Sequence, residues 1–102
     1  MSTKVHARIT PGEILVTEFL EPLGISQYRL ARATGLPQTR ISEIVHGRRR
    51  ITPDTGLRLS RALGLSERYW INMQTDYDIE TEHALHEEEL RQVEVLVPPE
   101  AA

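Results

Sequence analysis

This sequence of 102 residues contains no cysteine, and only five of its residues are aromatic. The absence of cysteine excludes disulfide bonds, cysteine-based zinc sites and thiol catalysis. Long apolar runs are missing too, because no segment approaches the about 18 apolar residues of a membrane-spanning helix. The first ten residues hold two fixed positive charges and no apolar run, which predicts the absence of a secretory signal. We therefore expect one soluble cytoplasmic domain with no membrane partner.

The usual signatures of enzymes are also missing. The sequence has no glycine-rich phosphate loop, no nucleophile paired with a base and no convergent pair of carboxylates. His83 and His86 stand one helical turn apart beside three glutamates. Two histidines on an acidic helix usually face solvent, so we expect no metal site and no cofactor. The sequence predicts a protein that is not an enzyme.

Charge is distributed unevenly along the chain, although the net charge is only −3. Residues 23–63 carry eight arginines and two acidic residues, whereas residues 64–102 carry two arginines and ten acidic residues. This asymmetry predicts two surfaces with different partners, one anionic and one cationic. The negative total therefore does not exclude nucleic-acid binding.

Capping signals predict five helices and an all-α fold. Serine, threonine or proline stands where each helix should begin, and the first start, Thr10-Pro11-Gly12-Glu13, has the form of a capping box. Glycine, which adopts left-handed backbone angles easily, stands at the predicted ends. The predicted starts are Thr10, Ser26, Pro37, Thr52 and Ser66, and four predicted ends are Gly24, Gly35, Gly47 and Gly64.

Apolar residues recur at helical spacing, which identifies the inward face of each predicted helix. On the fifth helix, Trp70 belongs to an aromatic stripe and is expected in the core. The inward positions expected on the other four helices are Leu15, Phe19, Leu23, Leu30, Ala31, Thr34, Ile41, Ile44, Val45, Leu59, Ala62 and Leu63.

Residues 26–63 have the organisation of a helix-turn-helix. Two short amphipathic segments meet at Gly35, and the second is followed by Gly47 and three consecutive arginines. In this motif the second helix enters the DNA major groove while flanking basic groups bind phosphates. The spacing therefore leads to a DNA-binding hypothesis.

The same residues resemble the lambda-repressor-like, or XRE-type, helix-turn-helix family. The motif residues are Gln27, Leu30, Ala31, Thr34, Gly35, Ile41, Ser42, Ile44 and Gly47. More narrowly, residues 9–80 resemble the HigA antitoxins of bacterial toxin–antitoxin modules. The matching segments include Pro11-Gly12-Glu13-Ile14-Leu15, Ile44-Val45-His46-Gly47-Arg48-Arg49, Ile51-Thr52-Pro53-Asp54-Thr55 and Tyr69-Trp70-Ile71-Asn72-Met73-Gln74.

This resemblance implies a homodimer that binds double-stranded operator DNA, represses its own operon and neutralises a HigB-like ribonuclease toxin that cuts messenger RNA. We expect a five-helix lambda-repressor-like bundle at residues 9–82 and an acidic tail at residues 83–102. One alternative is a stand-alone repressor without a toxin. Another is a pure protein-interaction module, which the positive charge of residues 23–63 disfavours.

Two positions depart from the family pattern. Gly56 and Ser60 stand in the fourth predicted helix, where family members more often have alanine. Glycine in a helix interior costs about 0.5–1 kcal/mol relative to alanine. We expect this departure to affect stability and not function.

The predicted base-reading residues lie near the start of the third helix, because that end of a recognition helix reaches the base edges. Glutamine pairs with adenine, threonine contacts a thymine methyl group, and glutamate accepts a hydrogen bond from cytosine. The alternative interpretation is that these are ordinary polar residues near the start of a helix, with no role in DNA binding. The candidates are Gln38, Thr39, Ser42 and Glu43.

The predicted phosphate contacts surround that helix. Gln27 lies inside the start of the second helix, where free N–H groups favour an anion. The arginines would position the protein on DNA without reading sequence, although such a triplet also occurs as plain solvated surface. These candidates are Arg40, Arg48, Arg49 and Arg50.

The aromatic stripe of the fifth helix is the predicted dimer interface. Two helix-turn-helix units must pair to read half-sites about 34 Å apart. Core packing is the alternative, and both can hold. The predicted interface residues are Tyr69, Met73 and Tyr77.

The acidic tail has no single predicted structure. Residues 93–97, Val-Glu-Val-Leu-Val, place valine at every second position as in an edge strand, whereas Leu90, Val93 and Val97 suit a helix. A disordered end is the third alternative. An acidic, partly apolar tail would suit a basic partner such as an RNA-cleaving toxin.

Overall fold

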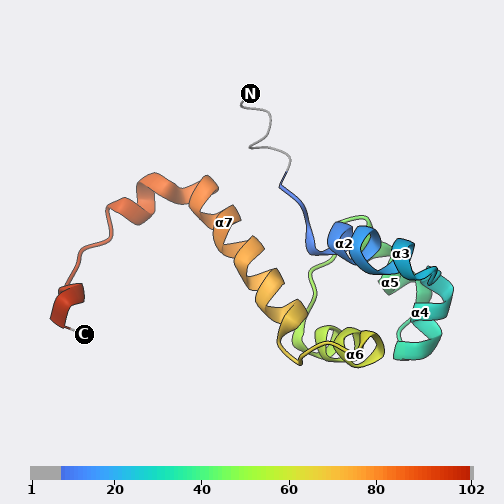
Figure 1. The fold of residues 1–102 in the computed structure, drawn as a ribbon. Helices are drawn as coiled ribbons and strands as arrows, with labels where there is room; N and C mark the ends of the chain where they lie inside the picture. The colour runs from blue at the N-terminus through green and yellow to red at the C-terminus, as the bar shows by residue number, and fades with distance from the viewer. Residues whose placement is uncertain (1–7, 102) are drawn as a thin grey trace.

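The computed structural model describes residues 8–101, and every regular element among them is helical, which confirms the all-α prediction. Figure 1 shows a cluster of short helices from which one long helix, α7 (Tyr69–Arg91), extends. The radius of gyration is 16.9 Å, above the roughly 13 Å of a compact chain of this size. Residues 1–7, most of the stretch predicted to lack a signal, lie outside the described residues, as does residue 102 of the tail.

The first helical segment contains three consecutive elements, α2 (Pro11–Ile14), η1 (Leu15–Leu20) and α3 (Glu21–Leu23). The predicted capping box is confirmed at its start. The Thr10 hydroxyl accepts from the Glu13 N–H at 3.1 Å, and the Glu13 carboxylate accepts from the Thr10 N–H at 3.0 Å.

The middle of this segment is a π-helix, which the sequence pattern did not predict. The Glu21 N–H donates to the Val16 carbonyl, five residues back instead of four. The extra residue moves the inward face, so Leu15 and Leu20 are buried at 0% and 5% exposure. The prediction that Leu23 faces the core is wrong, since this side chain is 60% exposed.

The two helices of the predicted motif are α4 (Gln27–Thr34) and α5 (Gln38–Val45). The Ser26 hydroxyl caps α4 by accepting from the Arg29 N–H at 3.0 Å. Gly35 ends α4 with a left-handed φ of 75°, which glycine adopts without a steric penalty. The helix-turn-helix geometry predicted for this stretch is therefore present.

Helix α5 ends in a turn at Gly47 that is held by a backbone hydrogen bond. Gly47 has a φ of 74°, and the Arg48 N–H donates to the Glu43 carbonyl at 2.8 Å. The next helix, α6 (Pro53–Leu63), begins after Thr52 as predicted. The Thr52 side chain makes no capping hydrogen bond to the backbone.

The last long helix begins later and ends later than the sequence predicts. Ser66 does not cap it, because residues 67–68 form a turn in which the Tyr69 N–H donates to the Ser66 carbonyl at 3.2 Å. Helix α7 then runs to Arg91, with non-helical backbone angles at His86. It continues past residue 82, where the apolar pattern weakens.

The core lies between these helices and contains most of the predicted positions. The prediction for Ala62 is wrong, because its side chain is exposed and lines a groove between α4 and α6. Trp70 is fully buried, so the core interpretation of this residue is confirmed. The buried apolar residues are Leu15, Leu20, Leu30, Ala31, Leu36, Ile41, Ile44, Ile51, Leu59 and Trp70.

The two departures from the family pattern lie on α6, and Gly56 stands where this helix meets α7. Gly56 and Ser60 are both buried. A Cβ on Gly56 would stand 3.1 Å from Ile71 Cγ1 and 3.6 Å from Trp70 Cβ. A small residue here lets α7 approach α6 closely, and this contact offsets part of the helix-propensity cost of glycine.

The end of the chain is irregular up to a short turn of 3-10 helix, η2 (Pro99–Ala101). Residues 93–97 form bends and irregular backbone, so their alternation does not produce the strand considered above. The helical alternative is correct for Leu90 and wrong for Val93 and Val97, because α7 ends at Arg91. Within the described part of the chain, no helix has the length and apolar character needed to cross a membrane.

Candidate nucleic-acid interface

The N-terminal end of α5 is exposed. Pro37, Gln38 and Thr39 are all exposed, whereas Ile41 and Ile44 are buried at 0% and 1% exposure. The apolar side of α5 therefore packs on the core and its polar start faces outward. This orientation is required of a recognition helix, because only an outward start can reach base edges.

The second turn of α5 holds the other two predicted base readers, and both are partly covered. Ser42 lies beside His46, whose Nδ1–H donates to the Ser42 carbonyl at 2.8 Å. The Glu43 carboxylate accepts from Arg49 Nε at 2.6 Å. Any contact between Glu43 and a cytosine must therefore compete with an arginine that the chain itself supplies.

The start of α4 presents free backbone donors near Gln27. Ser26 satisfies the N–H of Arg29, and the Leu30 N–H reaches the Ser26 carbonyl. Within residues 8–101 the N–H groups of Gln27 and Tyr28 have no acceptor. Together with the helix dipole, these two donors suit a phosphate oxygen.

The three arginines after α5 have three different environments. Arg49 pairs with Glu43, and Arg50 pairs with Asp78 of α7. Arg48 is exposed and has no ion pair with any side chain of residues 8–101. Arg40, on α5 itself, is partly buried. Of the triplet, Arg48 is thus the side chain that can meet a phosphate without breaking an existing pair.

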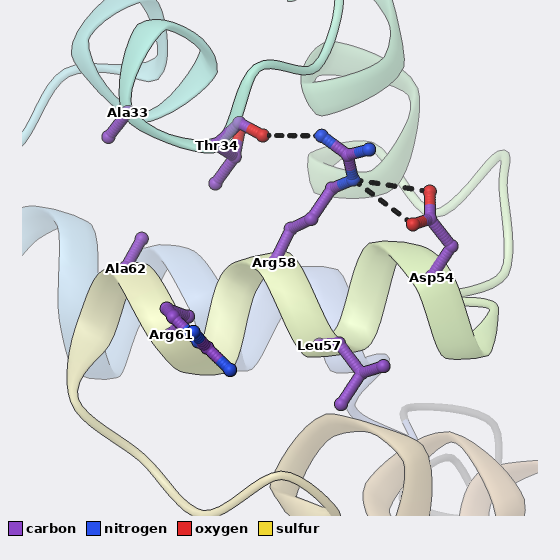
Figure 2. A pocket seen from close by; sticks show the side chains of 7 residues that line it. All are labelled: Ala33, Thr34, Asp54, Leu57, Arg58, Arg61 and Ala62. Atoms are coloured by element: carbon purple, nitrogen blue, oxygen red, sulfur yellow. Dashed lines mark hydrogen bonds and ion pairs between the residues drawn. The ribbon is translucent and has the colours of Figure 1, made fainter.

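Another arginine, on α6, connects this helix to the end of α4. Figure 2 shows the Arg58 guanidinium between the Thr34 carbonyl and the Asp54 carboxylate. Its Nη1 donates to the Thr34 carbonyl at 2.9 Å, and its Nε donates to Asp54 Oδ1 at 3.1 Å. The Thr34 carbonyl belongs to the last turn of α4, where a cation complements the helix dipole. Arg58 therefore supports the turn before α5.

A glycine sets the distance between α2 and α5. A Cβ built on Gly12 would lie 1.8 Å from the Ile44 carbonyl oxygen and 3.1 Å from Val45 Cα. These are backbone atoms, which cannot rotate away. From the sequence, Gly12 belongs to a capping box and to a family-matching segment, but its contact with α5 could not be predicted, because close approach between helices has no signal in a single sequence.

Two residues of α7 for which the sequence predicted no role contact the arginine loop, which we define as residues 47–51. Gln74 is 5% exposed, and its Oε1 accepts from the Ile51 N–H at 2.8 Å. Its Nε2 donates to Asp78 Oδ1 at 2.9 Å, and Asp78 Oδ2 accepts from Arg50 Nε at 3.1 Å. The signals in the sequence were their spacing of one helical turn on the fifth helix and the place of Gln74 at the end of a family-matching segment.

The electrostatics of Asp78 follow from this setting. Burial by itself raises the pKa of Asp78, but the hydrogen bonds from Arg50 and Gln74 and the positive charge of Arg50 outweigh it. The pKa therefore lies below the ordinary value of 3.8. The carboxylate is ionised at neutral pH, and it holds Arg50 by charge as well as by hydrogen bonding.

The predicted dimer residues all contact their own chain. The Tyr69 ring packs edge to face against Phe19, with 5.8 Å between the ring centroids. Met73 packs against the core, and the Arg8 guanidinium lies 4.6 Å from the centre of the Tyr77 ring. Tyr69, Met73 and Tyr77 are each only partly buried, so the dimer interface stays a prediction.

The histidines of α7 do not gather ligands for a metal. His86 lies near Glu82 and Glu89, with nitrogen-to-oxygen distances of 3.5 and 3.7 Å. In the part of the chain that the structure describes, no group of three or more histidines and carboxylates is arranged to hold an ion.

Comparison with known proteins places this geometry in a family. A helix-turn-helix family model matches residues 16–70. Antitoxin HigA-1 of Vibrio cholerae is 33% identical over 88 residues, which cover 86% of this chain and 83% of that protein. The chain belongs to the XRE-type helix-turn-helix family, in its HigA antitoxin branch.

Two further similarities extend over most of the chain. Virulence-associated protein I of Dichelobacter nodosus is 42% identical over 90 residues, which cover 88% of this chain and 80% of that protein. The solved structure of Pseudomonas aeruginosa antitoxin HigA with the higBA promoter has a TM-score of 0.81 and 36% identity. It covers 87% of this chain and 98% of its own. The predicted family is confirmed.

Proposed function

We propose that this chain is an antitoxin that represses its own operon as a homodimer on operator DNA and neutralises a HigB-like ribonuclease toxin. The exposed start of α5 carries the DNA part of the proposal, because the buried side of that helix leaves only this end free to read bases. The Pseudomonas aeruginosa relative was solved with promoter DNA, which supports the same use here.

In this proposal Gln38 and Thr39 read bases, because both are exposed and neither is engaged by another side chain of residues 8–101. Ser42 and Glu43 have a lesser part, since His46 and Arg49 already contact them. Phosphate contacts come from Arg48, Gln27 and Arg40. Arg49 can join them only when its pair with Glu43 breaks. Contacts of this kind hold the protein in register without selecting sequence.

The dimer follows from the geometry of the duplex. One α5 reads one half-site, and a second must lie about 34 Å away on the same face of the DNA. Tyr69, Met73 and Tyr77 remain the proposed contact between the copies, each with part of its side chain accessible.

The toxin part of the proposal rests on the family, together with the acidic residues that α7 presents to a basic partner. A place in the cytoplasm follows from access to operator DNA.

A binding experiment tests the DNA part directly. The purified chain is titrated against a duplex that contains the DNA directly upstream of its own gene, and fluorescence anisotropy follows binding. We expect tight, salt-dependent binding by two copies, and sedimentation of the complex counts those copies. Binding no tighter than to a scrambled duplex of equal composition would contradict operator recognition.

A second experiment tests the toxin part. The chain is co-expressed with the gene adjacent to its own, and growth and co-purification are measured. We expect the neighbour alone to arrest growth and the pair to restore it as a complex. If the neighbour is harmless, or does not bind the chain, the antitoxin activity is refuted while DNA binding stands.

A stand-alone repressor without a toxin is the second candidate. The relative from Dichelobacter nodosus, at 42% identity, bears the name of a virulence-associated protein and not of an antitoxin. The same co-expression experiment separates the two, since only the antitoxin needs a toxic neighbour. Both candidates use the same DNA surface.

A further inference from the structure

We propose that Gln74 and Asp78 of α7 are positioning residues that hold the arginine loop (residues 47–51) in place for DNA, with Arg50 as their tether instead of a phosphate ligand. This inference rests on the proposed DNA binding of α5 and assigns the residues that position its basic flank. It also replaces the phosphate role that the sequence predicts for Arg50.

The hold consists of a connected set of polar contacts. Gln74 is 5% exposed and binds the backbone of the loop through the Ile51 N–H at 2.8 Å. The same amide donates to Asp78 at 2.9 Å, which fixes the carboxylate that receives Arg50. Arg50 offers both Nε, at 3.1 Å, and Nη2 to Asp78 Oδ2. Each member therefore orients the next.

The loop needs such a hold because its other restraints lie at its start, where the Arg48 N–H donates to the Glu43 carbonyl and Arg49 pairs with the Glu43 carboxylate. Residues 46–50 are all exposed, and Ile51, at 3% exposure, is the first side chain after α5 that enters the core. The Ile51 N–H is a buried donor, and an unpaired buried donor is costly. Gln74 meets this requirement from α7, so the backbone beyond Gly47 has one preferred path. That path determines where Arg48 points.

A tethered Arg50 is a poor phosphate ligand in this arrangement. Its guanidinium already has a carboxylate partner, and contact with a phosphate requires that pair to break. Arg48 has no such pair within the described residues. The two adjacent arginines therefore have different roles: one anchors the loop, and the other binds the DNA backbone.

The first test compares salt dependence. Binding of Arg48→Ala, Arg50→Ala and the unmodified chain to the upstream duplex is measured at several salt concentrations. We expect Arg48→Ala to lower the slope of log K against log salt by about 0.9. Arg50→Ala should weaken binding about three- to tenfold and leave that slope unchanged. An equal loss of slope for Arg50→Ala would overturn the tether.

The second test removes the charge of the carboxylate with little change in shape. Asp78→Asn should weaken binding by about the same factor as Arg50→Ala, and the double variant should bind no worse than either single variant. The matched control is Asp76→Asn, which removes one exposed negative charge from the same helix. This control should bind equally well or slightly more tightly. Tighter binding by Asp78→Asn than by Asp76→Asn would mean that freed Arg50 contacts DNA, which contradicts the proposal.

A third measurement does not depend on DNA. Hydrogen exchange of the Ile51 amide, followed by NMR in the free protein, reports the bond to Gln74. We expect faster exchange in Gln74→Ala, Asp78→Asn and Arg50→Ala, with no change in Asp76→Asn and none at core amides. Unchanged Ile51 exchange would overturn the positioning role. If the Ile51 amide exchanges faster in these three variants but the chain does not bind the duplex, the hold on the loop stands and only the proposed DNA binding is refuted.

Discussion

The helix-turn-helix and the part of α7 beyond Asp78, which we call the outer helix, differ in two respects. Apolar side chains are buried in the first and exposed in the second, and the two regions have opposite charge. In α4 and α5, Leu30, Ile41 and Ile44 are at most 2% exposed. On α7, Ile79 and Leu85 are 51% and 66% exposed. Arginines dominate residues 23–63, and acidic residues dominate residues 64–102. The helices that surround the core, from α2 to the first half of α7, form what we call the body. The body contains both the buried apolar residues that stabilise the fold and the positive surface, whereas the outer helix adds charge and nothing to the core.

The first half of α7 joins the two regions. Trp70 lies in the core at 0% exposure, and Gln74 and Asp78 contact the loop after α5. Beyond Thr81 the helix has contacts only with its own residues among the interactions described. Figure 1 shows this outer part leaving the helical cluster. Substitutions before Thr81 should therefore affect the stability of the fold, whereas substitutions beyond it should have little effect on stability.

The largest effect is expected at the contact between α2 and α5. Gly12→Ala places a methyl group against the Ile44 carbonyl, which cannot move without shifting α5. We expect a loss of about 3 kcal/mol or more in the free energy of unfolding, measured by urea denaturation. The control is Gly24→Ala, where the added Cβ has no neighbour within 4 Å and only the φ of 66° is unfavourable. That control should cost about 1–2 kcal/mol, and equal losses in both variants would refute the steric argument.

The next effect concerns sequence recognition by the body. Gln38→Ala combined with Thr39→Ala should lower the preference for the operator over a scrambled duplex by about 1–3 kcal/mol per base pair that the lost side chains read. Both side chains are exposed, so the unfolding free energy should stay nearly constant. Competition binding measures the preference. Uniform weakening on every duplex would show that these residues do not read bases.

A third effect separates the two regions by charge. Arg48→Ala should weaken binding to all duplexes and lower the salt slope by about 0.9, because one phosphate contact is lost. Arg91, on the outer helix, pairs with Glu88 at 3.2 Å and provides the comparison. Arg91→Ala should leave the slope unchanged. Equal changes in the two variants would mean that the outer helix also contacts DNA.

A smaller effect concerns acid stability. The pKa of Asp78 is lowered in the folded chain, so its stabilising contribution is present above the ordinary value of 3.8 and is lost as the pH falls through the folded pKa. Asp78→Asn should be less stable than the unmodified chain at neutral pH, by under about 1 kcal/mol because Asp78 is partly exposed. The gap should close below pH 3.8. Urea unfolding across this range measures it, and a gap that widens in acid contradicts the assignment.

The smallest effect is expected at the chain end. Val93, Val95, Leu96 and Val97 are 65–80% exposed, so truncation after residue 92 removes little buried surface. We expect the free energy of unfolding to change by less than about 0.5 kcal/mol. Thermal and urea unfolding check this. A larger loss would show that the tail packs on the body and would remove the contrast drawn between the two regions.

Much of the body could be predicted from local signals. The capping box at Thr10, the cap at Ser26 and the left-handed turn at Gly35 involve residues within four positions of each other. Such interactions form wherever the chain is helical, so the sequence is sufficient to predict them. The outward start of α5 followed from the same periodicity.

The errors came from effects that cross between helices. The π turn at η1 exchanged Leu23 for Leu20 in the core, and Ala62 faces a groove instead of the core. Helix α7 begins at Tyr69 because a turn intervenes after Ser66. Each outcome depends on how one helix fits its neighbours, which periodicity within one segment does not describe.

The sequence by itself determined that the chain is helical, the caps at Thr10 and Ser26, the family and the division of charge, because these depend on nearby residues and on composition. Only the tertiary structure decided that Gly12 lies under the Ile44 carbonyl and that Arg50 meets Asp78, which is 28 residues away. Those relations depend on distances between helices, and such distances arise only when the whole core is packed.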